Sequence, residues 1–145
     1  MTIRAFAHAM NKSVKTVQKW VQDGYIPGAS IENDYIPDSA RIPYTQARAK
    51  NANAIYCSIV KAANERMHVV PKLYGISQEE FDGYIRRLTE AGFVESRVAD
   101  GVTYYDATLQ VAHSSRAFIL AVIEAGAKGL ASGVTEACIS RAQEV

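Results

Sequence analysis

The sequence has few of the residues from which metal sites and disulfide frameworks are built. It contains two cysteines and three histidines among 145 residues, and none of them stands at the spacing of a metal-binding motif. These residues are Cys57, Cys138, His8, His68 and His113. The motifs G-x-x-x-x-G-K, G-x-G-x-x-G and H-E-x-x-H are also absent. We therefore expect no metal, no cofactor and no enzymatic activity.

Long apolar runs and a secretory leader are lacking as well. The most apolar stretch, residues 117–134, is interrupted by Glu124 and Lys128, and falls short of the ~20 apolar residues that span a bilayer. The N-terminus has no charged region followed by an apolar stretch and a cleavage site. These features predict a cytoplasmic protein without membrane contact, in which the cysteines are reduced thiols.

A strong charge of either sign is the third absence. The formal net charge is +1, which neither indicates nor excludes nucleic-acid binding, because local patches decide it. The charge is nevertheless uneven. Residues 1–51 have a net charge of +3, residues 52–113 of −2 and residues 114–145 of 0. The basic excess therefore lies in the first third of a chain whose 48% apolar content is typical of a globular protein.

That first third predicts two short helices and a turn. The spacing predicts helices over residues 2–10 and 14–23, followed by an extended stretch broken by prolines. Ser13 is a natural N-cap for the second helix, and Gly24 suits its end because glycine tolerates positive φ. The valines at 14, 17 and 21, with Trp20 beside them, form an apolar stripe that we expect to be buried.

This segment resembles the helix-turn-helix of the MerR/excisionase superfamily, over residues 2 to about 43. The motif residues are Ser13, Thr16, Val17, Trp20, Gly24, Ile26-Pro27-Gly28-Ala29 and Tyr35-Ile36-Pro37-Asp38. The resemblance implies binding to double-stranded DNA, with the second helix in the major groove and the segment from Pro27 to Pro37 as a wing. The sequence departs from the family here, because residues 28–40 carry three acidic residues, Glu32, Asp34 and Asp38, and no basic residue stands before Arg41.

The polar face of the second helix has the chemistry that such a role requires. Lys15 and Lys19 can reach phosphates or guanine, and glutamines can pair with an adenine edge. The predicted DNA-binding residues are Arg4, Lys15, Thr16, Gln18, Lys19 and Gln22. The alternative is an ordinary solvated face on a helix whose other side is core.

The central segment has the element order of a winged helix. A helix is predicted over residues 53–67, and a second begins at Ser77, where Ser77 and Glu80 form a capping box, and ends at Gly92. Two β-prone runs around Asp100-Gly101 predict a hairpin. The acidic residues Glu79, Glu80 and Asp82 would repel phosphates at the start of the second helix, so protein contact is favoured for this unit.

The last segment, residues 114–145, reads as one kinked helix or two short ones. Its apolar stripe comprises Phe118, Ile119, Val122, Ile123, Leu130 and Val134, and glycines at 126, 129 and 133 weaken it. The stripe predicts a homodimer, because it offers more apolar surface than one short helix needs. The alternative is that it covers the central segment of its own chain.

Together these features predict a mainly α fold with three parts: a helix-turn-helix domain over residues 1–43, a winged-helix-like domain with a β-hairpin over residues 44–113, and a helical segment over residues 114–145. The predicted function is a small DNA-binding protein of bacterial or phage type, either a transcriptional regulator or an excisionase-like accessory factor. The alternative is an adaptor that keeps the helix-turn-helix fold but binds protein.

Overall fold

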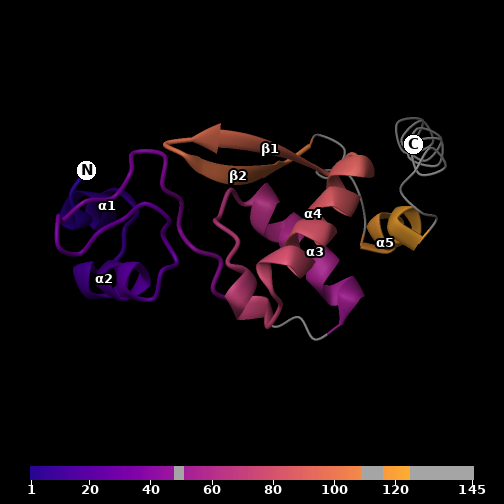
Figure 1. Cartoon of the computed structure of the whole chain (residues 1–145), viewed down its shortest axis with the longest axis horizontal. Helices are drawn as coiled ribbons and strands as arrows, with labels where there is room; N and C mark the ends of the chain where they lie inside the picture. The colour runs from indigo at the N-terminus through magenta and orange to yellow at the C-terminus, as the bar shows by residue number, and fades with distance from the viewer. Residues whose placement is uncertain (48–50, 109–115, 125–145) are drawn as a thin grey trace.

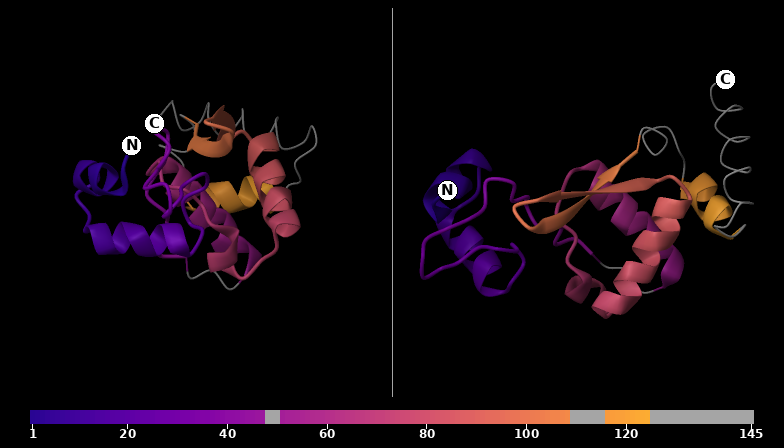
Figure 2. Two further views of the ribbon diagram at one scale, coloured as in Figure 1. Left: turned by 60° about the vertical axis from the view of Figure 1, so that its left-hand side comes forward. Right: turned by 45° about the horizontal axis from the view of Figure 1, so that its top comes forward.

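The protein is mainly α-helical, with one two-stranded antiparallel sheet in its described part. The computed structural model describes residues 1–47, 51–108 and 116–124. In chain order its elements are α1 (Ile3–Ala9), α2 (Val14–Gln22), α3 (Ala52–Asn64), the 3-10 turn η1 (Pro71–Tyr74), α4 (Gln78–Glu90), β1 (Val94–Ala99), β2 (Val102–Ala107) and α5 (Arg116–Glu124). Figure 1 and the right view of Figure 2 place α1 and α2 at one end of the molecule and α5 at the other.

Side-chain caps fix the starts of the helices. The Ser13 hydroxyl accepts a hydrogen bond from the Thr16 amide at 3.1 Å, as expected from the sequence. Ser77 and Glu80 form the predicted capping box at the start of α4. Asn51 caps α3 in the same manner, through the Ala54 amide. Each cap supplies an acceptor to an amide that has no partner inside the helix.

Two helix ends differ in how well the sequence marked them. Gly24, just after α2, has a φ of 77°, in agreement with its expected role. The helix α3 ends at Asn64, three residues before the predicted end at Met67. Arg66 adopts a φ of 54° there, which a non-glycine residue rarely does. A sequence without glycine or proline at this point gives no warning that the helix stops.

A small cluster of buried side chains holds the N-terminal part together. Its members are Ile3, Phe6, Ala7, Val17, Ile26, Ile36 and Ala40. Trp20, which was expected to be buried, is only partly covered and packs against the rim of this cluster. Of the three valines expected to be buried, only Val17 is, at 0% exposed, whereas Val14 and Val21 are partly buried. The indole lies one turn away and is too wide for so few neighbours to enclose.

A larger cluster fills the rest of the described chain. It joins the apolar faces of α3 and α4 to the base of the hairpin, and it includes Ile59, Leu88 and Phe93, which are all 0% exposed. From α5, Ile119 and Val122 belong to the same cluster, and Phe118 and Ile123 pack against it. Four of the six residues of the predicted dimer stripe therefore contact the core of their own chain.

The remaining features of that C-terminal prediction lie outside the described residues. They are Leu130, Val134, the three glycines and Cys138. The domain boundary at residue 113 falls there too, and the boundary at residue 43 stays a prediction. Cys57 is partly buried in α3.

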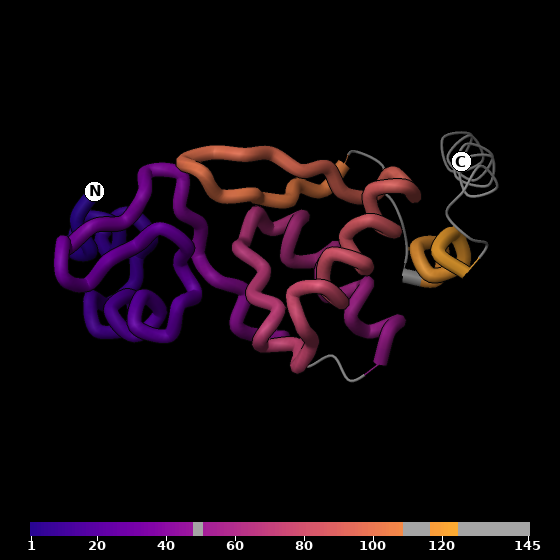
Figure 3. The backbone as a smooth tube through the Cα atoms, in the orientation of Figure 1, coloured from indigo at the N-terminus to yellow at the C-terminus, as the bar shows by residue number. Residues whose placement is uncertain are grey.

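The hairpin has the turn that the Asp-Gly pair predicts. Asp100 and Gly101 have φ values of 53° and 73°, as a type I′ turn requires, and Ala99 pairs with Val102 beside it. The register continues to Val94 opposite Ala107. In Figure 3 the tip of this hairpin reaches toward the N-terminal part of the chain.

Candidate nucleic-acid interface

Four of the predicted DNA-binding residues lie on one exposed face of α2. Lys15, Gln18, Lys19 and Gln22 are all exposed, and their spacing of three and four residues places them on the same side of the helix. The opposite side carries Val17 into the N-terminal cluster. The helix contains two lysines and no carboxylate, so its outer face is positively charged.

Thr16 differs from these four because its hydroxyl is used inside the protein. Thr16 is partly buried, and its oxygen accepts a hydrogen bond of 2.7 Å from the hydroxyl of Ser13. The pair closes the first turn of α2. The hydroxyl proton of Thr16 remains available as a donor. Thr16 therefore stabilises the helix start and stands at the edge of the polar face.

Arg4 belongs to a different element. It is exposed on α1, which packs against α2. The buried residues of α1 are Ile3, Phe6 and Ala7, so the guanidinium lies on the flank of that helix. The predicted set thus divides into a continuous face on α2 and one cation on a neighbouring helix.

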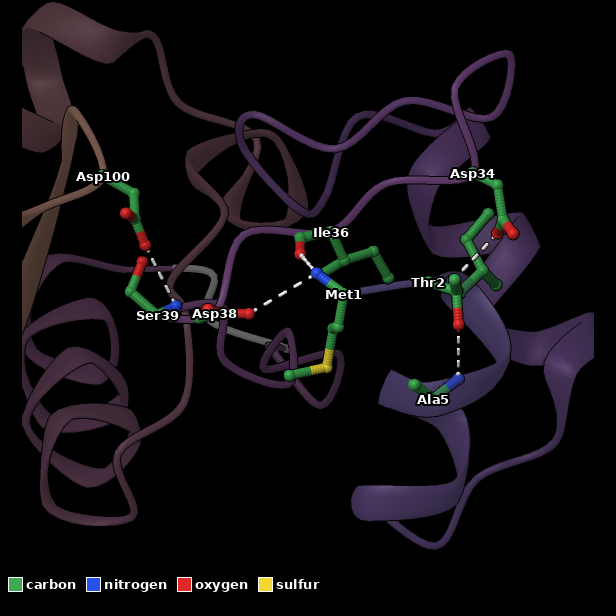
Figure 4. A network of polar contacts seen from close by, with 9 residues as sticks. Met1, Thr2, Ala5, Asp34, Ile36, Asp38, Ser39 and Asp100 are labelled. Carbon is green, nitrogen blue, oxygen red and sulfur yellow. Dashed lines mark hydrogen bonds and ion pairs between the residues drawn. The ribbon is translucent and has the colours of Figure 1, made fainter.

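The predicted wing, Pro27 to Pro37, folds as a tight loop, and one of its two carboxylates, that of Asp34, has a partner inside the protein. Ser30 and Tyr35 pair through two backbone hydrogen bonds of 2.9 and 3.0 Å. The Asp34 carboxylate accepts a hydrogen bond of 3.0 Å from the Ile3 amide at the start of α1 (Figure 4). A carboxylate is favourable there because the first amides of a helix lack partners.

Asp38 lies beside the amino group of Met1, at 3.4 Å, although 85% of its side chain is exposed (Figure 4). Asp34 therefore has a close partner inside the protein, and Asp38 has a more exposed one. Glu32 is exposed on the loop. The wing offers DNA no cation of its own before Arg41.

The start of α4 is acidic, and its carboxylates are partly explained by local bonds. Glu80 belongs to the capping box, and Asp82 accepts a hydrogen bond of 2.9 Å from the Gln78 amide group. The helix also carries two arginines, Arg86 and Arg87, that could face phosphates, but Arg87 donates a hydrogen bond of 2.8 Å to the hydroxyl of Tyr56. This arrangement leaves α4 less suited to a phosphate backbone than α2.

Sequence reasoning missed a polar junction around Arg41. One nitrogen of Arg41 lies 2.7 Å from the Asp106 carboxylate, and another donates to the backbone oxygen of Tyr105 at 3.2 Å. The guanidinium also lies over the ring of Tyr104, 4.9 Å from its centre. In the sequence, Arg41 is only a lone arginine between Pro37 and Pro43, and this pattern does not predict a partner 65 residues away at Asp106.

The tip of the hairpin extends this junction. The Ser39 amide donates a hydrogen bond of 3.1 Å to the carboxylate of Asp100 (Figure 4), and the Ser39 hydroxyl lies 3.2 Å from that of Tyr104. Hydrogen bonding from Ser39, first from its side chain and then from its amide, lowers the pKa of the Asp100 carboxyl. The segment that follows the wing is therefore attached to the hairpin.

His68 also packs against the Tyr104 ring. Its imidazole contacts the Tyr104 ring edge to face, with centres 5.9 Å apart. Burial, and then the positive charge of Arg41, lower the pKa of His68 from 6.5 to about 4. The imidazole is therefore neutral near pH 7. Among the described residues, no group of histidine, cysteine or acidic side chains that could hold a metal ion surrounds it. We therefore interpret His68 as a residue that packs against its neighbours.

A shallow groove of about 460 Å³ opens where the end of α2 meets η1. Its lining residues are Asp23, Gly24, Tyr25, Val70, Pro71, Lys72, Gly75, Ile76 and Gln78. The lining contains one acid and one base, and it does not have the convergent polar groups of a small-molecule site. Among the described residues, histidine, cysteine and acidic side chains do not gather in a group that could hold a metal ion.

Within the described ranges, no helix has the length and apolar character needed to cross a bilayer. Comparison of the chain with protein-family models, with curated proteins and with solved structures finds no match in any of the three.

Proposed function

We propose that the protein binds double-stranded DNA through the polar face of α2. The observation that carries the proposal is that Lys15, Gln18, Lys19 and Gln22 share one exposed face of a helix without a carboxylate. Lysines neutralise phosphates or pair with guanine, and glutamines match the donor and acceptor pattern of adenine. The capped start of α2 and the buried Val17, with Val14 and Val21 partly buried beside it, hold this face in a fixed orientation.

The proposed biological class is a cytoplasmic regulator or an excisionase-like accessory factor without enzymatic activity. This part rests on the resemblance of residues 2–43 to the MerR/excisionase helix-turn-helix. The uneven charge agrees with it, since residues 1–51 carry the basic excess. In this proposal α1 and α2 are the helix-turn-helix, Arg4 supports phosphate contact from α1, and the central segment is the winged-helix-like unit.

The test is duplex binding as a function of salt. A mixed-sequence DNA duplex is titrated with the full chain at several salt concentrations, and fluorescence anisotropy reports binding. We expect the Lys15→Ala/Lys19→Ala protein to bind more weakly and to lose roughly one to two units of slope in log K against log salt, because each lost phosphate contact removes about 0.9 unit.

The matched control removes two exposed cations elsewhere. Lys61 and Arg86 are exposed on α3 and α4, and Lys61→Ala/Arg86→Ala changes the net charge by the same amount. We expect this variant to keep the wild-type salt slope. Absence of duplex binding by the wild type at low salt, or equal losses in both double variants, would contradict the proposal.

A protein-binding adaptor is the second candidate, and the start of α4 favours it. Glu79, Glu80 and Asp82 are exposed there, and Arg87 is engaged by Tyr56. An acidic helix start suits a basic protein surface better than DNA. If Glu79→Gln/Asp82→Asn leaves duplex binding unchanged while the α2 lysines remain essential, then α4 is not part of the DNA interface, whereas stronger binding would place α4 near the phosphates.

A further inference from the structure

Among the described residues, no strand pairs with the outer edge of β1, whereas Arg41 contacts the outer edge of β2. The four central residues of β1, Glu95 to Val98, are all exposed. On β2 the outward backbone oxygen of Tyr105 accepts a hydrogen bond from Arg41. In Figure 1 β1 runs along the upper margin of the molecule, outside β2. An edge strand with free amides and carbonyls is a template for pairing with another strand.

The register of the hairpin identifies which backbone groups face outward. The two-residue turn makes Ala99 and Val102 a hydrogen-bonded pair, and such pairs alternate along an antiparallel ladder. The Thr108 amide donates a hydrogen bond of 3.0 Å to the Phe93 oxygen, so Phe93, like Ala99, is a residue whose backbone groups point toward β2. The amides and carbonyls of residues 94, 96 and 98 therefore point away from β2.

The charges on β1 are complementary to themselves in one register. In an antiparallel pair of two β1 strands centred on Ser96, Glu95 of each copy lies opposite Arg97 of the other. This register also brings outward backbone groups opposite outward ones, as hydrogen bonding requires. Shifting the centre to Glu95 or to Arg97 places like charges opposite each other, which is destabilising. Only the register centred on Ser96 joins the two opposite charges.

Within one chain these two side chains are poorly satisfied. Glu95 lies directly opposite Asp106 in the hairpin, so two carboxylates face each other. Asp106 is neutralised mainly by Arg41 at 2.7 Å, and Arg97 lies farther from it, at 3.8 Å, with 63% of its side chain exposed. Within the described part of the chain, no cation pairs with Glu95. An arginine from a second copy would meet that carboxylate.

The same register covers an exposed apolar side chain. Val98 is 69% exposed, more than the other large apolar residues of the described chain. In the centred pair it lies opposite Val94 of the second copy. Val94 belongs to the central cluster, on the side of the sheet where the rings of Phe81 and Tyr105 meet. The pairing therefore covers Val98, which each chain leaves exposed.

We propose that two copies of the chain pair through β1 in an antiparallel register centred on Ser96, forming a four-stranded sheet. Two short strands bury less than the roughly 1,200 Å² of a stable complex, so the dimer forms in the micromolar range. The proposal does not rest on DNA binding, and its test contains no DNA, so its failure is distinct from failure of the proposed function.

The test is charge reversal followed by rescue, read by sedimentation equilibrium of the full chain. Glu95→Arg and Arg97→Glu, each alone, place like charges opposite each other at two points of the dimer. We expect each to raise the dimer Kd by roughly ten- to a hundredfold. The double variant Glu95→Arg/Arg97→Glu restores opposite charges and returns the Kd toward that of the wild type.

Thermal melting separates association from folding. Within one chain Glu95→Arg relieves the repulsion with Asp106, whereas Arg97→Glu adds to it, so a purely structural role predicts opposite effects of the two variants. Loss of the dimer in both, with rescue in the double variant, is expected only from pairing between copies. A wild-type monomer at high micromolar concentration, or a dimer that tolerates both reversals, overturns the proposal.

Disulfide formation tests the centre of the register. Ser96→Cys brings two thiols together at the symmetry axis, where Cα atoms of a hydrogen-bonded pair lie about 5.5 Å apart, within the range of a disulfide. We expect a covalent dimer on mild oxidation. Thr103→Cys is the matched control, because Thr103 is exposed on β2. Equal cross-linking of both variants, or none in the first, overturns the register.

Discussion

At the scale of single residues, the position of His68 near Arg41 and Tyr104 changes how readily its imidazole binds a proton. His68 is partly buried beside the Tyr104 ring and within the field of Arg41. These two causes, burial first, lower its pKa from 6.5 to about 4 in the folded chain. The unfolded chain therefore binds a proton that the folded chain does not between these two values.

The sign of the resulting pH dependence follows directly. The stabilisation is fully present above pH 6.5 and is lost as the pH falls toward 4, because protonation then favours the unfolded chain. We expect urea unfolding midpoints to decline over this range in the wild type, and to decline less in His68→Phe. Carboxylates titrate in both proteins, so the difference between the two curves is the measurement.

Arg41→Met provides a second reading of the same group. Removing the guanidinium removes one of the two causes, so the pKa of His68 should rise part of the way toward 6.5. The chemical shift of the imidazole proton, followed by NMR during a pH titration, reports this change. An unchanged titration would mean that Arg41 does not lie close to the ring.

At the scale of elements, the sequence predicted what local chemistry controls. Ser13, Ser77 with Glu80, and Asp100-Gly101 act on neighbours within four residues, and the helices and hairpin formed where these residues placed them. The partial exposure of Trp20 and the early end of α3 were not predictable in this way. They depend on how many side chains the rest of the fold supplies and on an arginine in a left-handed conformation.

In the candidate site, too, the features set by local spacing were predicted and the long-range contacts were not. The exposed face of α2 follows from helix periodicity and was predicted, although whether it binds DNA stays a prediction. The junction of Arg41 with Asp106 was missed, because it joins residues 65 apart and no spacing rule covers such a distance. The intramolecular role of Asp34 was missed for the same reason, since its partner is the amide of Ile3.

Two glycines in turns predict different losses of stability. Gly24 and Gly28 both have positive φ, at 77° and 80°. An added Cβ has no neighbour within 4 Å at Gly24, but at Gly28 it would lie 3.1 Å from Cγ of Pro37. We expect Gly24→Ala to cost about 1 kcal/mol from backbone strain alone, and Gly28→Ala to cost about 1 kcal/mol more from crowding.

Gly83 is the control for this comparison. It lies inside α4 without positive φ, and an added Cβ meets nothing within 4 Å. We expect Gly83→Ala to stabilise the protein by roughly 0.5–1 kcal/mol, because alanine favours the helix. Urea unfolding of the three variants measures the order, and equal losses at Gly24 and Gly28 would show that Pro37 yields without cost.

At the scale of the whole molecule, α5 completes the central core. Ile119 is 5% exposed and Val122 is 0% exposed within that cluster. We expect Ile119→Ala to lower the free energy of unfolding by roughly 2–4 kcal/mol, through lost apolar contact and a cavity. Circular dichroism monitors the whole chain during unfolding, while the fluorescence of the single tryptophan, Trp20, reports on the N-terminal cluster.

Ala121 supplies the comparison for this variant, because it is exposed on the same helix. Ala121→Ser should change stability by less than about 0.5 kcal/mol. If Ile119→Ala melts like the wild type, its side chain is not part of the core, and the C-terminal stripe becomes available again for the homodimer predicted from the sequence.

The junction between the hairpin and the segment after the wing has a consequence for how the molecule rotates in solution. Two clusters joined by a few residues without regular structure would ordinarily reorient independently of each other. Arg41 and Ser39 remove that freedom, since they hold the connecting segment against β2 and the turn at Asp100. Amides of α2 and of α4 should therefore share one rotational correlation time, and a ligand held by α2 would inherit the slow tumbling of the entire chain.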